Sequence, residues 1–248
     1  MTGPQPPFGD DPAAWAALLE NVRHAFMAAS AGSNAPVNWE LAGQLATGLA
    51  GNGDPELTGQ EKTAATEALR LADLWLDPVT IFPAGISRTQ AWNRLEWVKQ
   101  TQTSWRELCD PVAAQVVAAM TSLLTEGDGT PNQLKNMLGG EFAGQIGSLS
   151  QIFAGVGGVV FGAQVGQGIG TLSKEVLAAT DIGLPLGEAG VGALVPANLA
   201  AYAGGLQRPL DEVRLYVALR EAAHHRIYQH VPWLRGHVFD AVTAYARG

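Results

Sequence analysis

Apolar residues recur at intervals of three and four along most of the chain, which is the spacing of helices with one buried face. Asn38 and Thr58 stand where capping residues precede such runs, and proline follows aspartate at Asp11-Pro12 and Asp110-Pro111, which favours helix starts there. The pattern predicts a mainly α protein. Helices are expected over residues 11–29, 38–51, 58–77, 86–107, 110–124 and 209–230, with one more after residue 232.

The same spacing predicts which faces of these helices lie inside the protein. Trp92 and Trp105 fall on the apolar side of the helix predicted over 86–107. They could form a binding platform, but core packing is the favoured interpretation. The inward residues expected in the two helices before it are Leu41, Leu45 and Leu49, and then Ala64, Ala68, Leu71, Leu74 and Trp75.

Residues 142–173 contain no charged side chain, and glycine recurs at every fourth position within them. On a helix this repeat forms a smooth strip that lets another helix approach closely. One interpretation is a glycine zipper that enters a membrane, because about 20 apolar residues cross a bilayer. The other is a buried helical hairpin at the centre of a soluble domain, favoured by the interspersed glutamines and the lack of a flanking basic cluster. The strip consists of Gly158, Gly162, Gly166 and Gly170.

Short apolar pieces bounded by glycine and proline follow at 180–186 and 191–196. They predict extended chain, with a small hairpin or edge strand near residues 181–196. One or two helical turns are expected after it at 198–203.

A polar, glycine-containing loop at 126–131 predicts an internal boundary. Residues 1–12 are rich in proline, glycine and aspartate and are expected to be disordered. The chain is therefore expected to comprise an N-terminal helical region over 13–130. A second region over 131–248 holds the glycine repeat, the extended segments and the last helices.

The composition of the chain excludes several classes of protein. Apolar residues make up 47% of its 248 residues, which is enough for a substantial core. The net charge of −8 argues against a surface that binds nucleic acid. A single cysteine, Cys109, excludes an internal disulfide framework and is expected to be a small buried hydrophobe. No secretory signal is visible at the N-terminus, so a cytoplasmic protein is expected.

Candidate chemistry is concentrated near the end of the chain, where four of the five histidines fall within fourteen residues. The string Arg220-Glu221-Ala222-Ala223-His224 matches the helical zinc-protease motif H-E-x-x-H except at its first position. In the intact motif both histidines hold zinc and the glutamate is the general base for the metal-bound water. Glu221 is thus the candidate catalytic residue and His224 the candidate metal ligand. Arg220 has no lone pair to donate and would repel a metal ion.

Two arrangements of these residues remain open. In the first, zinc is held by His224 together with downstream residues, because three nitrogen or oxygen ligands and a water make a catalytic site. The spacing of these downstream candidates follows no recognised motif. They are His230, His237 and Asp240.

The second arrangement contains no metal, and we favour it over a zinc site. Glu221 bonds His225 one helical turn further on, and Tyr228 shares that side of the helix as a further binding residue. Arg220 forms an ion pair with a carboxylate of the chain. The candidate partners of Arg220 are Asp181, Asp211 and Asp240.

Several separated motifs within residues 36–248 resemble a bacterial family of zincin-like candidate hydrolases, often described as zinc-dependent metalloproteases. A sister group is described as associated with the biosynthesis of a deazaflavin coenzyme. The motifs that carry the resemblance are Gly162–Gln167, Asp181–Leu186, Val195–Asn198, Leu215–Arg226, Val231–Arg235 and Ala244–Gly248.

The resemblance implies a mainly helical zincin-like fold with the active-site helix near residues 209–230. It implies zinc ligands at the positions of Arg220 and His224 and a catalytic acid/base at Glu221, and this chain departs from that pattern at Arg220. One branch of the family resembles this chain in carrying R-E-A-A-H as its usual form. Relatives are also expected to continue beyond the position of Gly248, where a further ligand could lie.

Three functions are consistent with these observations. The chain could be a metallopeptidase relative in which Glu221 polarises a water and residues 181–196 hold a peptide as an added strand. It could be a non-catalytic pseudoenzyme that binds a peptide or protein, with Arg220 gripping a carboxylate. It could also be a membrane-associated glycine-zipper protein. We favour a metallopeptidase-like protein with impaired or absent zinc chemistry, and expect no nucleic-acid partner and no stable membrane insertion.

Overall fold

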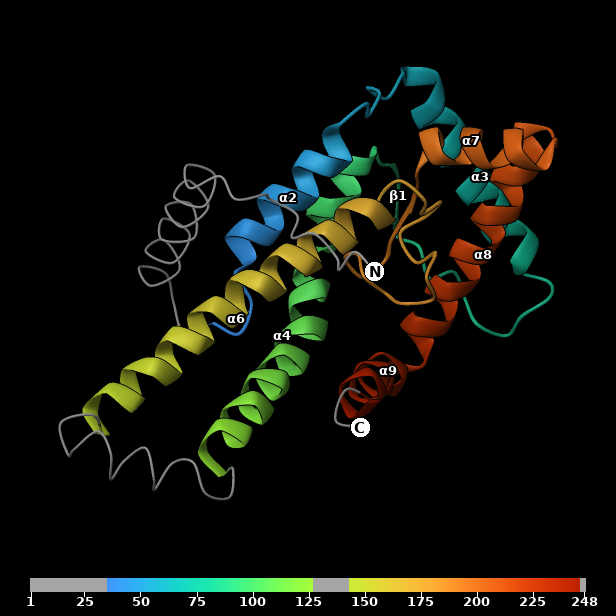
Figure 1. Ribbon diagram of the computed structural model, residues 1–248. Helices are drawn as coiled ribbons and strands as arrows, with labels where there is room; N and C mark the ends of the chain where they lie inside the picture. Colours follow the sequence, from blue (N-terminus) through green and yellow to red (C-terminus); the bar gives the residue numbers. More distant parts are fainter. Residues whose placement is uncertain (1–34, 127–142, 246–248) are drawn as a thin grey trace, which may run out of the picture.

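The computed structural model describes residues 35–126 and 143–245, which are mostly helical with a small two-stranded sheet (Figure 1). This architecture confirms the predicted mainly α fold with a small strand segment. The helix expected over 11–29 and the segment 1–12 lie outside the described residues. The elements in chain order are α2 (Trp39–Gly51), α3 (Gly59–Leu76), β1 (Arg88–Ala91), α4 (Arg94–Glu126), α6 (Ala143–Leu172), β2 (Val191–Leu194), α7 (Pro196–Leu206), α8 (Leu210–His230) and α9 (Pro232–Tyr245).

Capping residues begin α2 and α3 where the sequence predicts them. The Asn38 side chain accepts a hydrogen bond from the backbone N–H of Leu41 at 3.0 Å. Thr58 and Glu61 form a reciprocal capping box at the start of α3. Each cap contributes about 1 kcal/mol, because it satisfies backbone donors that the helix leaves without partners.

The helix predicted over 86–107 is wrong for its first residues, because Arg88–Ala91 form strand β1. The backbone N–H of Arg88 donates to the carbonyl oxygen of Gly190 at 3.0 Å, which draws this segment into the sheet. Helix α4 starts only after Asn93, whose side chain accepts from the Glu96 N–H at 2.7 Å while the Glu96 carboxylate accepts from the Asn93 N–H at 2.9 Å. The spacing Asn-x-x-Glu is itself a signal for a helix start.

The separate helix predicted to start at Asp110 is also wrong, since α4 continues through Pro111. The Asp110 carboxylate does not cap a helix, because it accepts a hydrogen bond from Trp39 Nε1 at 2.7 Å. This bond ties α4 to α2. Proline inside a helix forfeits one backbone hydrogen bond and costs about 3 kcal/mol, which α4 tolerates.

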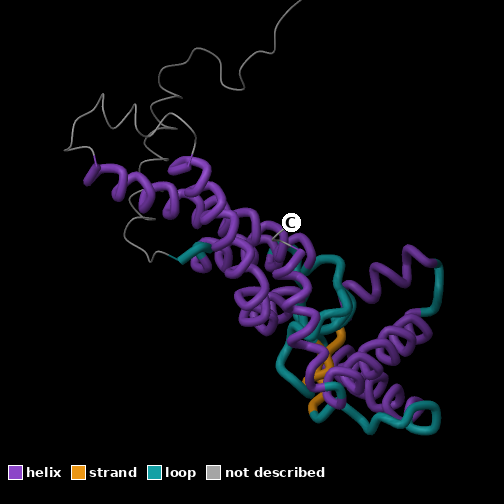
Figure 2. The backbone as a smooth tube through the Cα atoms, turned by 90° about the horizontal axis from the view of Figure 1, so that it is seen from below, coloured by secondary structure: helices purple, strands orange, loops and turns teal. Residues whose placement is uncertain are grey.

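The small two-stranded sheet lies among the helices and loops (Figure 2). Strands β1 and β2 are parallel, with Arg88 opposite Val191. On the other edge of β2, residues 177–179 run antiparallel, and the Val195 N–H donates to the Leu177 carbonyl oxygen at 2.9 Å. Every residue of β2 is buried.

The glycine repeat packs against α2, which confirms the predicted close approach of a second helix. The Asn38 N–H donates to the Gly158 carbonyl oxygen at 2.8 Å. A β-carbon at Gly162 would lie 2.5 Å from the Asn38 carbonyl oxygen, and one at Gly166 would lie 2.5 Å from the carbonyl oxygen of Ala42. Residue numbers rise together along both helices, so α2 and α6 are a parallel pair (Figure 1). The helical hairpin predicted within residues 142–173 is therefore wrong, because this segment is the single helix α6.

Alanines form most of the inner face of α2, and of the three predicted leucines Leu49 packs against Gly170 of the glycine strip. Ala42, Ala46 and Ala50 are buried, whereas Leu45 is 36% exposed. The glycine strip brings the backbone of α6 so close that the side chains facing it at Ala42 and Ala46 are small, and Leu49 fits only where it lies over Gly170. None of the helices in the described ranges combines the length and the hydropathy that crossing a bilayer requires.

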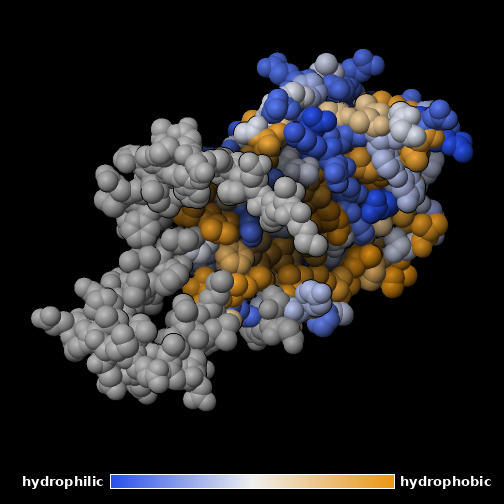
Figure 3. Space-filling view, viewed as in Figure 1, coloured by the Kyte–Doolittle hydropathy of each residue, from blue (hydrophilic) through white to orange (hydrophobic). Residues whose placement is uncertain are grey.

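Helix α3 is rotated from its predicted face. Ala65, Leu69 and Ala72 are buried, and α3 packs on α8. The predicted inward residues Leu74 and Trp75 are 64% and 51% exposed. Hydrophobic residues also reach the surface on the face shown in Figure 3, so apolar spacing alone does not identify a buried face here.

Two hydrophobic clusters hold the elements together. One contains Trp92 and Ile169, with Trp105 partly buried against it, which confirms core packing for the tryptophans. The other joins Leu69 of α3 to Val217 of α8. The predicted boundary near residue 130 lies outside the described residues, but both clusters draw on residues from both sides of it.

Cys109 lies partly buried on α4 against the first cluster. Burial raises the pKa of its thiol to about 11, so very little of it is thiolate at mildly alkaline pH. We expect iodoacetamide to alkylate the native protein at least about a hundredfold more slowly than the protein unfolded in guanidinium. Mass spectrometry at successive times measures both rates, and equal rates would contradict the buried thiol.

Candidate active-site helix and adjacent cavity

Helix α8 carries the motif residues past the edge of the small sheet. Val217, Ala218 and Ala222 are buried in the cluster shared with α3 and fix the rotation of α8. This rotation turns Glu221 inward, so that its side chain is 0% exposed. A buried carboxylate is very costly unless hydrogen bonds compensate for the lost water.

Hydrogen bonds from four groups compensate the buried Glu221 carboxylate. Its Oε2 accepts from the backbone N–H of Thr180 at 3.0 Å and from the Thr180 hydroxyl at 2.5 Å. Its Oε1 accepts from the Ala193 N–H at 3.4 Å and lies 3.1 Å from Nε2 of His225. The predicted bond between Glu221 and His225 is confirmed.

Glu221 takes the place of a strand carbonyl at the edge of β2. In a strand, alternate N–H groups point to the same edge. On the edge away from β1 these groups all have acceptors, so the hypothesis that residues 181–196 hold a peptide as an added strand finds no free edge on β2. The pairs are Val191 with Glu188, Ala193 with Glu221, and Val195 with Leu177.

Arg220 binds a carboxylate of the protein itself. Its Nη1 donates to Asp181 Oδ1 at 3.0 Å, and its Nη2 donates to the Asp181 carbonyl oxygen at 3.2 Å. Of the three candidate carboxylates, Asp181 is the partner. The other Asp181 oxygen accepts from the Leu177 N–H at 3.0 Å, so the pair also fixes the turn before the loop. The Arg220 side chain is 40% exposed, so the ion pair itself adds little stability.

His224 has one ring nitrogen that is not used by the Thr180 contact. Its Nδ1 lies 2.9 Å from Thr180 Oγ1, and that hydroxyl donates its proton to Glu221. The hydroxyl can then only accept from His224, so we assign a proton to Nδ1 and the lone pair to Nε2. Burial lowers the pKa of His224, and the Arg220 charge lowers it further against the opposing effect of Glu221, so the neutral form is favoured.

The other candidate ligands lie apart from His224. The His230 ring stacks on Phe82 with the ring centroids 6.1 Å apart. The His237 ring contacts Trp233 edge-on at 5.8 Å, and Asp240 is exposed. Among the residues of the two described ranges, no three histidine, cysteine or acidic side chains come together as a metal ion would require.

The motif residues do not fit a catalytic zinc site. Zinc at such a site needs three neutral or anionic donors and an open position for water. Arg220 supplies no lone pair, and both oxygens of Glu221 are engaged by groups of the fold. Only Nε2 of His224 is left to coordinate, and one imidazole does not make a catalytic site.

Arg226 is an important buried residue that the sequence reasoning missed. It is 2% exposed and lies one turn after the buried Ala222. Its guanidinium donates to Asp77 Oδ1 and to the Phe82 carbonyl oxygen, each at 2.7 Å, and pairs with Asp73 at 3.0 Å. These bonds lock α8 to the end of α3. Helical spacing from Ala222 was the available signal, but arginine is rarely found inside proteins.

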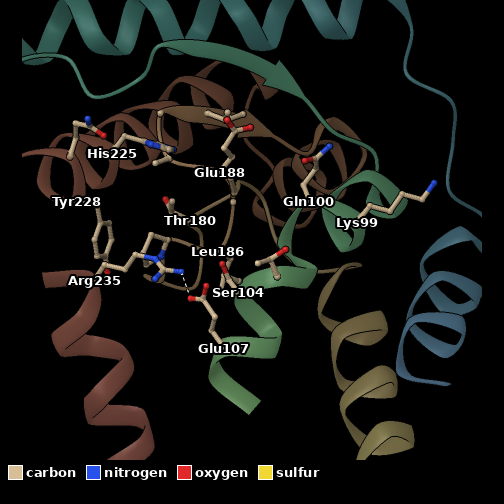
Figure 4. A pocket seen from close by; sticks show the side chains of 18 residues that line it. Lys99, Gln100, Ser104, Glu107, Thr180, Leu186, Glu188, His225, Tyr228 and Arg235 are labelled. Carbon is tan, nitrogen blue, oxygen red and sulfur yellow. Dashed lines mark hydrogen bonds and ion pairs between the residues drawn. The ribbon is translucent and has the colours of Figure 1, made fainter. Parts of the chain in front are cut away.

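A cavity of about 450 Å³ opens beside the motif, between α4, α8, α9 and the loop that follows residue 179 (Figure 4). Thr180, His225 and Tyr228 line it, whereas His224 is not among its lining residues. The Tyr228 hydroxyl donates to the Gly183 carbonyl oxygen at 2.6 Å, and burial raises its pKa. Two of the three predicted binding residues, His225 and Tyr228, therefore line the cavity.

The opposite wall of the cavity comes from α4. Lys99, Gln100, Ser104 and Glu107 line it from that helix, and Glu107 forms an ion pair with Arg235 of α9 at 2.6 Å (Figure 4). Lys99 is exposed and has no ion-pair partner in the part of the chain that the structure describes. The wall thus presents amide and hydroxyl groups and one uncompensated cation.

This fold and this helix agree with the family predicted from the motifs. The family model of zincin-like metallopeptidases matches residues 37–248, so the chain belongs to that family. A search of curated proteins finds no match. The chain is similar in structure to a protein from Chloroflexus aurantiacus described as a candidate hydrolase with a novel fold, with a TM-score of 0.56 and 19% identity. The likeness covers 85% of this chain and 59% of that chain, and at this identity it concerns the fold alone.

Proposed function

We propose that this zincin-like protein binds a polypeptide in the cavity beside α8 and does not hydrolyse it through zinc. The observation that carries the proposal is the state of Glu221, whose two oxygens have four partners within the fold. A general base needs a lone pair within reach of the water that it activates. A carboxylate has about four lone-pair sites, and the fold engages as many.

Arg220 supports the same proposal. The guanidinium that stands at the first ligand position has no lone pair for a metal, and its Nη1 and Nη2 already donate to Asp181. This alters the pseudoenzyme hypothesis, in which Arg220 binds the ligand. The ligand-binding surface is the cavity instead.

The cavity suits a polypeptide by size and by chemistry. Sites for small molecules typically enclose about 300–1,000 Å³ with a few well-placed polar groups in the lining, so this cavity of about 450 Å³ has room for a short piece of a polypeptide. Here Gln100 and Ser104 can hydrogen-bond to peptide groups, and Lys99 can pair with an acidic side chain or terminus.

A random peptide library incubated with the tag-free protein and zinc tests both halves of the proposal. We expect intact peptides to remain bound through gel filtration, with no cleavage products in the mass spectrum. The variant Gln100→Trp places a bulky ring at an exposed residue that lines the cavity, and it should weaken retention of the peptides about tenfold or more. The matched variant Ala114→Trp adds the same bulk at an exposed position on α4 that does not line the cavity, and it should have no effect.

Two results would overturn the proposal. Cleavage that chelators stop and that disappears in His224→Ala would demonstrate an active zinc site. Retention that Gln100→Trp leaves unaltered would locate the bound peptides outside the cavity.

A further inference from the structure

Strand β1 has an open edge on the side away from β2. The N–H groups of Arg88 and Trp92 donate to carbonyl oxygens on the β2 side at 3.0 and 2.8 Å. Because successive residues of a strand point their N–H groups to opposite edges, those of Thr89 and Ala91 point outward. No group in residues 35–126 or 143–245 hydrogen-bonds to either of them.

A groove of about 490 Å³ lies along this edge. Residues 86–90 form one wall, and Arg70 and Asp73 of α3 contribute the other. Glu221 and the motif lie at the opposite edge of the sheet, beyond β2. The groove is therefore separate from the cavity beside α8.

The groove carries one arginine that, among the described residues, has no ion-pair partner. Asp73 is already paired with the buried Arg226 at 3.0 Å. Arg88 pairs with Glu188 at 2.6 Å, but its side chain stays 55% exposed. Arg70 is exposed and has no ion-pair partner within the described ranges. In a chain with a net charge of −8, this arginine without an ion pair favours a carboxylate on the ligand.

We propose that this groove binds an acidic polypeptide segment in an extended conformation, as an additional strand beside β1. The unpaired backbone groups of an edge strand are a template for another chain. Thr89, which lines the groove, and Ala91, the next outward residue of β1 just beyond the lining, supply the backbone hydrogen bonds, and Arg70 and Arg88 select carboxylate side chains. The site does not depend on the function proposed for the cavity, and either can fail without the other.

The test uses the full chain and a fluorescent heptapeptide of alternating valine and glutamate, titrated by anisotropy. Two matched peptides separate the backbone contribution from the charge contribution. One is N-methylated at alternate residues and cannot complete the ladder, and the other replaces glutamate by lysine. We expect saturable binding of the valine–glutamate heptapeptide and at least about tenfold weaker binding of the N-methylated and the lysine peptides.

Variants of the protein locate the bound peptide. Thr89→Pro removes the outward N–H without removing a bond to β2, and Arg70→Glu reverses the unpaired charge, so each should weaken binding about tenfold or more. Thr89→Val keeps the N–H, and Lys62→Glu reverses an exposed charge two turns earlier on α3, so both should stay within about twofold. Circular dichroism of all four variants checks that the fold persists.

Hydrogen exchange by NMR gives a readout that a merely electrostatic surface would not produce. Bound peptide should slow exchange at the amides of Thr89 and Ala91 and leave Gln90, which already faces β2, unaltered. Absence of saturable binding, equal binding of the N-methylated peptide, or no added protection at Thr89 would each overturn the proposal. So would a loss in Gln100→Trp as large as in Thr89→Pro, because the peptide would then occupy the cavity.

Discussion

Glu221→Gln is expected to unfold at a clearly lower temperature than the wild-type protein. The amide keeps the volume of the carboxylate, but its NH2 replaces one of the two oxygens and so faces a group that itself donates, the backbone N–H of either Thr180 or Ala193. Losing charge-assisted bonds to a buried group costs about 2–4 kcal/mol. For a chain of this size the loss corresponds to roughly 5–15 °C in Tm, which differential scanning calorimetry measures.

The control is Glu67→Gln, which makes the same change at an exposed position of α3 and should alter stability by less than about 0.5 kcal/mol. Replacing a glutamate that serves only as a general base is expected to leave the Tm unchanged or to raise it, because active-site residues are often neutral or costly for stability. A Tm for Glu221→Gln equal to that of the control would contradict the structural role and restore the case for hydrolysis.

Thr180→Val extends this test to the partner of Glu221. The Thr180 hydroxyl contacts both Glu221 and His224, so the double variant with Glu221→Gln should show a coupling energy of about 1–2 kcal/mol. Additive effects would mean that the carboxylate does not depend on this network.

Local chemistry at the motif was predictable because it follows from helical geometry. The contact between Glu221 and His225 is a property of any helix with this spacing. The partners that decide the role of Glu221 come from elsewhere, since Thr180 and Ala193 belong to the loop and to β2. No local pattern connects them to the motif, so the sequence favoured a metal-free arrangement but did not identify the groups that hold Glu221. The pairing of Arg220 was foreseen only as one of three candidates for the same reason.

The starts of α2 and α3 were more predictable than their buried faces. Caps at Asn38 and Thr58 depend on residues within one turn, and the structure has them where expected. The buried face of α2 depends instead on how near another backbone comes. Glycine in α6 lets that backbone approach, so Ala42 and Ala46 face α6 where leucine spacing indicated Leu41 and Leu45, and only Leu49 packs on the strip as predicted.

Gly166→Ala is expected to destabilise the protein by about 2–4 kcal/mol, although alanine is the better helix former. The added β-carbon would lie 2.5 Å from the carbonyl oxygen and 2.7 Å from the α-carbon of Ala42. Both atoms belong to the backbone of α2, so no side chain can rotate away to make room. The helices must separate, and the close packing along the whole strip is lost. Urea denaturation followed by circular dichroism measures the change.

Gly168→Ala makes the same substitution two residues further along α6 and should have the opposite sign. A β-carbon at Gly168 would meet nothing within 4 Å, so only the gain in helix propensity remains, about 0.5–1 kcal/mol of added stability. Both variants replace a glycine of α6 by alanine. Comparing their stabilities therefore separates the effect of the contact with α2 from the effect of helix propensity. Stabilisation by both alanines would show that α6 is not seated on α2. A loss at Gly166 alone would tie the glycine repeat to one partner helix, which explains a costly run of glycines without any need for a membrane.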